Sequence, residues 1–326
     1  AGRVVSARTP MTVAMNVDGD RQFTGDDRAF PVAGTASSEP HFERVAILGV
    51  GMIGGSVAAA MRRRSLATRI VGFGPPPSVA DAAGLGLIDE AAERVDEAVT
   101  GADLVVLAAP IPALPDLLRR IAPVLSPRAV VTDCASTKQS VIVAARDALG
   151  PLAGRFVAAH PIAGSERNGP GAARADLFDG CKLMLCATET TDADALAAVT
   201  ALWVALNAEV VPIDAARHDR LYAELSHWPH AVAFALSAAV ADSEFADDAL
   251  RFSGAGLRDT TRIGASSAEL WADILLDNRV AALASADRFQ HRLDRLRDAL
   301  QQADRQALVD ELAHASGWRQ RLNGAA

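Results

Sequence analysis

Hydrophobic residues follow two different patterns along the chain. Up to about residue 213, short apolar runs alternate with segments of helical character, which is typical of strands buried on both faces of a sheet. This alternation indicates an α/β fold with a doubly wound, mainly parallel sheet, whose ligands bind beyond the carboxyl ends of the strands. We predict strands over residues 44–49, 69–74, 103–109, 129–133, 155–159, 183–186 and 210–213.

From about residue 214 the strand pattern stops and helical periodicity takes over. We expect helix over 215–240, then a glycine-containing loop, then helix from Leu270 to the end. Within the last segment Phe289, Leu293, Leu296 and Leu300 are spaced by 4, 3 and 4 residues, so they lie on one helix face. Such a stripe belongs either to an intramolecular core or to a subunit interface.

These patterns divide the chain into three parts. Residues 1–40 contain turn-forming residues without a sustained apolar period, and we expect a flexible tail there. Residues 41–213 form the α/β domain, and residues 214–326 form an all-α domain. The tail lacks the continuous apolar segment of a secretory signal.

Charge and composition exclude several classes of partner. Lys and Arg total 32 against 40 Asp and Glu, a net charge of −8, so we expect neither nucleic acid nor an anionic membrane surface as a partner. No apolar run is long enough to span a membrane. The 3 cysteines do not form a disulfide or zinc pattern, which favours a cytoplasmic location.

A glycine-rich segment, G-x-G-x-x-G, connects the first predicted strand to an alanine-rich helix. Gly49 permits a tight turn, Gly51 allows a pyrophosphate to approach the backbone, and Gly54 allows close helix packing. This context predicts dinucleotide binding, and the alternative is a tight turn without a ligand. The predicted cofactor-binding residues are Gly49, Gly51, Met52, Ile53, Gly54, Pro110 and Ser136.

The choice between NAD and NADP stays open. The second predicted strand ends at Gly74, where an acidic residue would ordinarily bind the ribose 2′-hydroxyl. The missing carboxylate removes a repulsion against a 2′-phosphate, but the loop that follows has no arginine to attract one.

His160 stands where a predicted strand enters a turn. Pro161 favours extended geometry for the residue before it, which would hold His160 at the end of the strand. The simpler alternative is a histidine that only ends the strand.

Four further segments follow the glycine loop along the chain. They are 133–138 with Ser136, 160–166 with His160, the Ser-His-Trp-Pro-His run 226–230, and 257–263 followed by Trp271. In this order they resemble the prephenate dehydrogenase family, which includes arogenate and cyclohexadienyl dehydrogenases of tyrosine biosynthesis. The resemblance extends from about residue 45 to about residue 278.

The resemblance implies a nucleotide-binding domain followed by a helical domain that binds substrate and forms a homodimer. It implies oxidative decarboxylation of prephenate to 4-hydroxyphenylpyruvate, with His160 accepting the proton of the ring hydroxyl and Ser136 orienting that hydroxyl. It also implies that Arg262 binds a substrate carboxylate and that His230 reaches polar groups of the substrate. It places three further residues near the pocket: Ser226, Arg258 and Trp271.

The chemistry requires these residue types independently. Removing hydride from a carbinol carbon requires a base for the hydroxyl proton, and a neutral histidine, with its ordinary pKa of about 6.5, suits this role near neutral pH. A planar guanidinium binds a carboxylate in a bidentate manner, which favours arginine over lysine. The reaction requires no metal.

Each of these residues also has a simpler interpretation. Ser136 could cap a helix beginning near Thr137, and Arg262 could be a solvated charge. Trp271 could belong to the core. His227 and His230 resemble a metal pair, but a proline lies between them and a third ligand is missing.

Two positions depart from the family pattern. Ala135 replaces a glycine before Ser136, and Thr260 replaces an aromatic residue after Asp259. Because both lie near the expected pocket, the choice between prephenate and arogenate stays open.

Two other classes of protein remain as alternatives. β-Hydroxyacid and imine-reducing dehydrogenases generally use a lysine of their helical domain, and residues 214–326 contain none. The other alternative is a nucleotide-binding module without turnover, in which replacing His160 would leave function intact.

Overall fold

The computed structural model describes residues 40–164 and 167–324. The predicted tail, apart from its last residue, lies outside these residues, as do positions 165 and 166 of the histidine segment.

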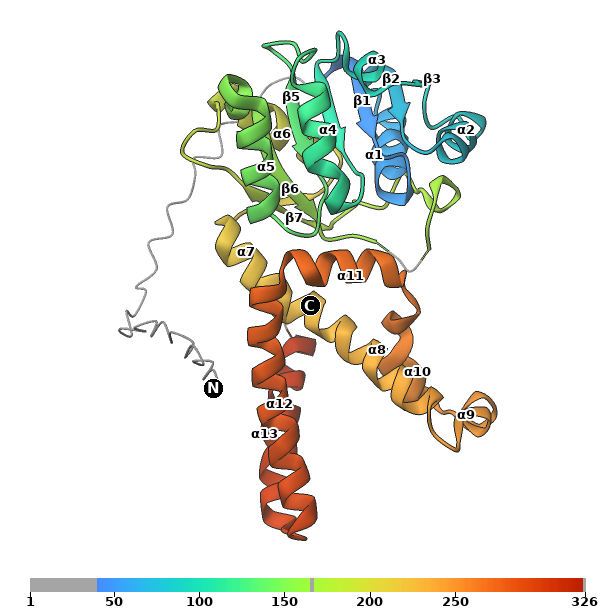
Figure 1. Cartoon of the computed structure of the whole chain (residues 1–326), viewed down its shortest axis with the longest axis vertical. Coiled ribbons are helices and arrows are strands. Elements are labelled where there is room, and N and C mark those ends of the chain that lie inside the picture. Colours follow the sequence, from blue (N-terminus) through green and yellow to red (C-terminus); the bar gives the residue numbers. More distant parts are fainter. Residues whose placement is uncertain (1–39, 165–166, 325–326) are drawn as a thin grey trace, which may run out of the picture. The chain divides into compact units, whose positions relative to one another are not determined.

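The first part of the described chain forms one eight-stranded sheet (Figure 1). Neighbouring strands run parallel except β6 and β7, which are antiparallel. The predicted mainly parallel α/β sheet is therefore confirmed, although β3, only 2 residues long, was too short to predict. In spatial order the strands are β3 (Glu90–Ala91), β2 (Ala67–Phe73), β1 (Phe42–Leu48), β4 (Leu104–Leu107), β5 (Val130–Asp133), β6 (Phe156–Pro161), β7 (Lys182–Cys186) and β8 (Glu209–Pro212).

Helices cover both faces of this sheet. Val45 and Ile47 of β1 belong to the core on one face, whereas Ala46 and Leu48 belong to the core on the other. Because successive side chains point to opposite faces, a strand with both faces covered needs apolar residues at every position. The first face is covered by α1 (Met52–Arg63), α2 (Pro76–Gly84) and α6 (Ala193–Ala205), the second by α3 (Val95–Val99), α4 (Leu114–Ile121) and α5 (Gln139–Leu149).

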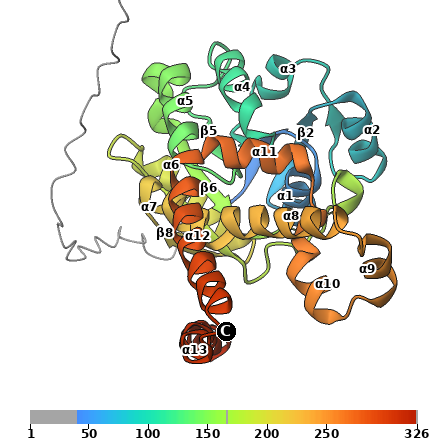
Figure 2. The same cartoon turned by 60° about the horizontal axis from the view of Figure 1, so that its bottom comes forward.

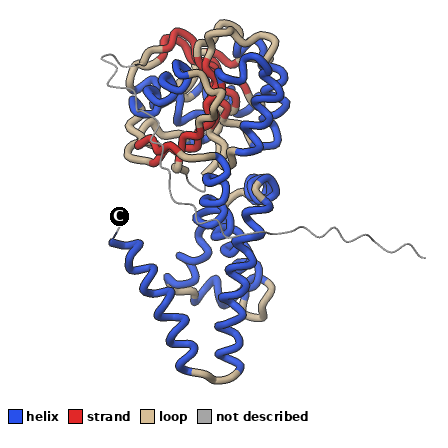
Figure 3. The backbone as a smooth tube through the Cα atoms, turned by 90° about the vertical axis from the view of Figure 1, so that its left-hand side faces the viewer, coloured by secondary structure: helices blue, strands red, loops and turns tan. Residues whose placement is uncertain are grey.

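The second part of the described chain is helical. A π-helical turn, Ala223–His227, interrupts the helix predicted over 215–240, and Pro229 lies in the first turn of the helix that follows. The last two helices run side by side as an antiparallel hairpin (Figure 3), in which Glu311 forms ion pairs with Arg292 and Arg295. The helices are α7 (Ala215–Tyr222), α8 (Trp228–Ala241), α9 (Ala246–Phe252), α10 (Ala255–Thr261), α11 (Ala268–Asp277), α12 (Arg279–Gln301) and α13 (Arg305–Gly324).

The prediction of a glycine-containing loop between residues 240 and 270 was wrong. This segment contains α9 and α10, each only 7 residues long. Helices this short give almost no periodic signal, and neither has a buried residue, with Leu250 80% and Phe252 72% exposed. Asp247 and Asp248 in the first turn of α9 favour its start through the helix dipole.

Helix α11 connects the two parts of the structure. It lies beside the α/β part (Figure 2), where Ile274 is buried and Trp271 packs against the core formed with α4 and α5. Among residues 40–164 and 167–324, no helix is both long and apolar enough to cross a membrane.

Candidate active site

The glycine-rich segment forms the turn between β1 and α1. Gly49 has φ +103°, and a Cβ there would lie 2.5 Å from the Ala108 carbonyl, so only glycine fits. A Cβ on Gly54 would lie 2.0 Å from the carbonyl oxygen of Gly49. A Cβ on Gly51, in contrast, would have no protein atom within 4 Å. The first and third glycines thus serve packing, and the open space at the second fits a pyrophosphate approaching the backbone.

The other predicted cofactor residues lie at the same edge of the sheet. Met52 and Ile53 begin α1 and are half-buried, and Pro110 is exposed where the chain leaves β4. At Gly74, after β2, a Cβ would have its nearest protein neighbour at 3.7 Å. The carboxyl ends of β1, β2 and β4 therefore leave room for a nucleotide.

A buried ion pair fixes the strand end that carries His160. Asp133 and Lys138 are fully buried and form an ion pair across the turn after β5. The Lys138 Nζ donates a hydrogen bond to the Ala159 carbonyl at 2.7 Å, and the Ala159 N–H donates to Asp133 Oδ1 at 3.0 Å. These bonds hold the backbone of β6 immediately before His160. Asp133 and Lys138 belong to the segment 133–138 singled out in the sequence, where nothing local indicated this role.

Ser136 lies in the same turn and is half-buried. Helix α5 begins at Gln139 with Lys138 as its N-cap, so the alternative that Ser136 caps this helix was wrong. Among the described residues, the Ser136 hydroxyl has no hydrogen-bond partner. The substituted Ala135 is buried, and its N–H donates to Asp133 at 2.9 Å. Its φ is not positive, so alanine fits this position without backbone strain.

His160 is the first member of a line of three polar side chains. Its Nδ1 lies 2.9 Å from Nε2 of His218, and Nδ1 of His218 lies 2.9 Å from Oδ1 of Asp219. The ring of Tyr222 packs edge-on against that of His160, with centroids 5.0 Å apart. His218, Asp219 and Tyr222 all belong to α7. They were not predicted, because their only local signal was a His-Asp pair in a helix.

Asp219 also caps a helix of the α/β part. The N–H groups of Lys138 and Gln139 donate to its two carboxylate oxygens at 2.8 and 3.0 Å. Helix α5 has no N-cap side chain of its own, so a carboxylate from α7 provides the cap. The Asn278 side chain donates to the Asp219 carbonyl at 2.7 Å and fixes this end of α7.

The Ser-His-Trp-Pro-His run builds a second cluster at the π-helical turn. The Nδ1–H of His230 donates to the Ser226 carbonyl at 2.9 Å, so the Nε2 of the neutral ring carries a lone pair. The ring stacks on Trp271, with centroids 3.5 Å apart and an interplanar angle of 18°. His227 is fully buried, and its Nδ1 accepts from Asn278 at 3.1 Å.

The environment keeps all of these histidines neutral near pH 7. Burial, with a smaller contribution from His218, holds the pKa of His160 well below its ordinary value. Burial likewise lowers the pKa of His218 and lowers that of His227 to about 4. Burial also lowers the pKa of His230, and the nearby Arg262 contributes. A neutral imidazole can accept a proton, as a general base must.

The structure brings together most of the predicted substrate residues. His230 is in direct contact with Ser226 and with Trp271, and the exposed Arg262 lies near His230 at the start of a 3₁₀ turn. Arg258 does not join this cluster. It is exposed on α10 and donates to the Ser253 hydroxyl at 3.3 Å.

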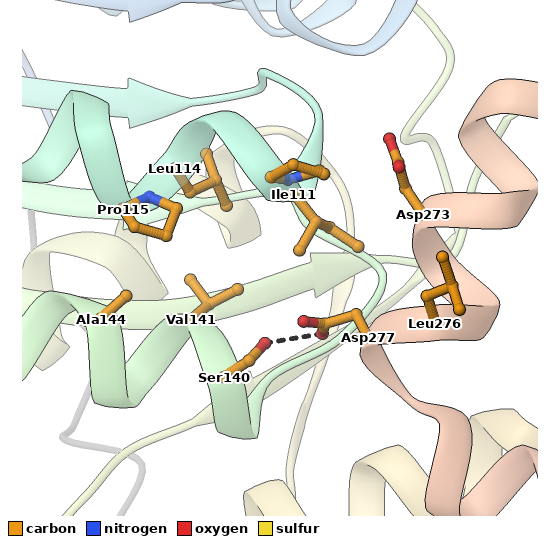
Figure 4. A pocket seen from close by; sticks show the side chains of 10 residues that line it. Ile111, Leu114, Pro115, Ser140, Val141, Ala144, Asp273, Leu276 and Asp277 are labelled. Atoms are coloured by element: carbon orange, nitrogen blue, oxygen red, sulfur yellow. Dashed lines mark hydrogen bonds between the residues drawn. The ribbon is translucent and has the colours of Figure 1, made fainter.

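A cavity of about 340 Å³ lies at the seam between the α/β part and α11 (Figure 4). Its lining is mainly apolar, and Ser140 donates a hydrogen bond to Asp277 across it at 2.6 Å. No predicted site residue lines it. Among the described residues, no group of three or more His, Cys, Asp or Glu side chains could hold a metal ion.

Two family models match the chain. The nucleotide-binding domain of prephenate dehydrogenase matches residues 57–212, and the dimerization domain of prephenate dehydrogenase matches residues 214–314. A cyclohexadienyl dehydrogenase of Zymomonas mobilis is 32% identical over 281 residues, covering 85% of this chain and 95% of the relative. A prephenate dehydrogenase of Bacillus subtilis is 33% identical over 283 residues, covering 86% of this chain and 76% of the relative.

Solved structures give the same result. Prephenate dehydrogenase from A. aeolicus, in complex with hydroxyphenyl propionate and NAD+, has a TM-score of 0.80 and 31% identity, covering 87% of this chain and all 100% of that one. The arogenate dehydrogenase of Synechocystis has a TM-score of 0.70 and 29% identity, covering 86% of this chain and 99% of that one.

Proposed function

The chain belongs to the prephenate dehydrogenase family of NAD-dependent oxidoreductases, and we propose that it oxidatively decarboxylates prephenate to 4-hydroxyphenylpyruvate in tyrosine biosynthesis. The observation that supports this proposal most strongly is the arrangement of His160. Its Nδ1 is engaged by His218, and its Nε2 remains to accept a proton from a substrate.

In this proposal His160 is the general base. The ring hydroxyl of prephenate gives its proton to Nε2 of His160 while Ser136 orients the hydroxyl. The depressed pKa of His160 keeps the ring unprotonated below neutral pH, and positioned general bases contribute about 10²–10⁴-fold to a rate. Loss of CO2 then aromatises the ring, and this makes the overall reaction strongly favourable.

The second cluster binds the rest of the substrate. Arg262 is exposed and binds one carboxylate through its planar guanidinium. The Nε2 lone pair of His230 accepts a hydrogen bond from the substrate, and Trp271 and Ser226 hold the His230 ring in place. We leave Arg258 outside the pocket, because it is exposed and its side chain donates a hydrogen bond to Ser253.

The nucleotide lies over the glycine turn. Gly51 and the first turn of α1 receive its pyrophosphate, with Met52, Ile53 and Pro110 beside it. When bound, the nicotinamide supplies the hydride acceptor. We propose NAD+ as cofactor, with NADP+ as an alternative because Gly74 presents no carboxylate that would repel a 2′-phosphate.

A second candidate substrate is arogenate, alone or together with prephenate. The relative from Zymomonas mobilis, which matches over 95% of its length, is a cyclohexadienyl dehydrogenase. Arogenate differs from prephenate by an ammonium group on its side chain. Both substrates present the same ring hydroxyl to His160, so the chemistry proposed above applies to each.

We also propose a homodimer formed through the helical part. Phe289, Leu293 and Leu300 of α12 are 40%, 46% and 66% exposed, so this stripe is not an intramolecular core. Water contact on a stripe of large apolar residues is unfavourable, and a second copy of the helical part would cover it.

The test is an assay of prephenate and arogenate, each with NAD+ and with NADP+, followed by absorbance of the reduced nicotinamide. Turnover of prephenate is expected, and no turnover in any combination would refute the proposal. His160→Ala should lower kcat about 10²–10⁴-fold while NAD+ still binds. The control is His41→Ala, at an exposed histidine at the start of the sheet, which should retain activity.

A further inference from the structure

The line from Asp219 through His218 to His160 determines where the proton of each ring lies. Asp219 Oδ1 is within 2.9 Å of Nδ1 of His218 and also accepts the N–H of Lys138 at 2.8 Å. Asp219 Oδ2 accepts two further hydrogen bonds, at 3.0 and 3.2 Å, from the backbone and side chain of Gln139. Because donors surround both oxygens at a helix N-terminus, Asp219 is ionised and can only accept.

This fixes the tautomer of His218. Since the Asp219 carboxylate cannot donate, Nδ1 of His218 must carry a proton and donate to it. His218 is fully buried, and burial disfavours its charged form. A neutral ring that carries its proton on Nδ1 has a lone pair on Nε2.

The same step then applies to His160. The lone pair on Nε2 of His218 faces Nδ1 of His160 at 2.9 Å, so His160 must donate from Nδ1. The neutral His160 ring is left with its lone pair on Nε2. We infer that His218 and Asp219 are positioning residues, which hold His160 in the one tautomer able to take a proton from the substrate.

The inference deepens the proposed function and rests on it for the identity of the proton donor. The substrate hydroxyl O–H bond breaks and an N–H bond forms at Nε2 of His160. The imidazolium formed keeps its Nδ1–H bond to His218, and Asp219 compensates its charge through that ring. Because His160 lies on β6 while His218 and Asp219 lie on α7, the base is correctly protonated only when the helical part is docked on the α/β part.

Two substitutions of His218 separate this role from simple packing. His218→Leu fills space without an acceptor, which leaves the His160 tautomer undetermined. His218→Gln can accept from His160 through its carbonyl and donate to Asp219 through its amide. We expect kcat to fall on the order of 10²-fold in the leucine variant, with substrate and NAD+ KM values little changed, and to recover by roughly 10-fold or more in the glutamine variant.

The direct test is ring-nitrogen NMR of the full chain labelled with ¹⁵N-histidine, with His160 signals assigned by their loss in His160→Gln. We expect a protonated Nδ1 and an unprotonated Nε2 on His160, and a mixture of tautomers in His218→Leu. A protonated Nε2 on His160 in the unaltered chain would overturn the inference, as would equal loss of kcat in the leucine and glutamine variants. If the unaltered chain turns over no cyclohexadienyl substrate, the proposed function fails while the NMR result still decides the tautomer.

Discussion

The α/β part and the helical part differ in how far they bury their apolar side chains. Ile47 of β1 and Leu107 of β4 are fully buried, and all residues of β4 and β5 lie inside. In α12 of the helical part, Leu283 is 62% and Leu300 66% exposed. The α/β part therefore completes its own core, while the helical part presents an apolar surface that a partner would have to cover.

The α/β part contains a fully buried ion pair as well as exposed pairs such as Lys182–Glu209. The Asp133–Lys138 pair lies in the interior of the α/β part, whereas Arg288 and Glu224 of the helical part pair near the surface. Breaking a buried pair leaves an uncompensated charge, but an exposed pair is replaced by water. Loss of the buried pair should thus cost more stability than loss of an exposed pair in either part.

The largest effect is expected from Lys138→Met. The substitution leaves the buried Asp133 carboxylate without its ion-pair partner and should lower the free energy of unfolding by about 3–5 kcal/mol. Urea unfolding followed by circular dichroism measures this. Lys182→Met is the matched control, because its pair with Glu209 is half-exposed and should contribute only about 0–1 kcal/mol. Equal losses of unfolding free energy in the two variants would show that burial of an ion pair does not determine how much its removal costs.

The regular part of the fold was predictable because its pattern is local. Residues 45–48 of β1 and all of β4 have both faces covered, so these stretches are continuously apolar. The two-residue β3 and the short helices α9 and α10 were missed because their residues are too few to show a period.

The candidate site was predictable only where its signal is contiguous. The glycine turn is a run of neighbouring residues, and His160 is followed directly by Pro161. His218 contacts His160 across 58 positions of sequence, and Asp219 reaches Lys138 across 81. Long-range contacts of this kind depend on how the two parts dock, and no local pattern reports that.

The apolar surface of α12 distinguishes the helical part from the α/β part as the proposed dimer interface. The double variant Leu293→Glu with Leu300→Glu should weaken the proposed dimer about 100-fold, because each glutamate would be buried in the interface without a partner. Sedimentation velocity over a range of concentrations measures the change. Leu85→Glu with Val204→Glu places the same charges on the α/β part, where these residues are 56% and 57% exposed, and should leave association unchanged. If the Leu85 and Val204 substitutions weakened the dimer instead, the interface would lie on the α/β part.

The smallest effect concerns pH, since the fully buried histidines, His218 and His227, both come from the helical part. Their pKa values are lowered in the folded chain, so below about pH 6.5 the unfolded chain binds more protons than the folded chain. The free energy of unfolding therefore decreases as the pH is lowered. With its pKa at about 4, His227 alone should cost about 2 kcal/mol between pH 7 and pH 5. The pKa of Asp219 is lowered by hydrogen bonds from His218 and the start of α5 that outweigh its burial, so its contribution is lost only at lower pH.

Urea unfolding at pH 7 and pH 5 tests this, with His227→Gln beside the exposed His41→Gln. The His227 variant keeps an acceptor for Asn278 through its amide carbonyl, and it should show a smaller loss between the two pH values because the amide does not titrate. The His41 variant should retain the full loss. If both variants keep the same pH dependence as the unaltered chain, the buried imidazole of His227 is not the group that titrates, and the sensitivity to acid must then come from His160 or His218 at the contact between the two parts.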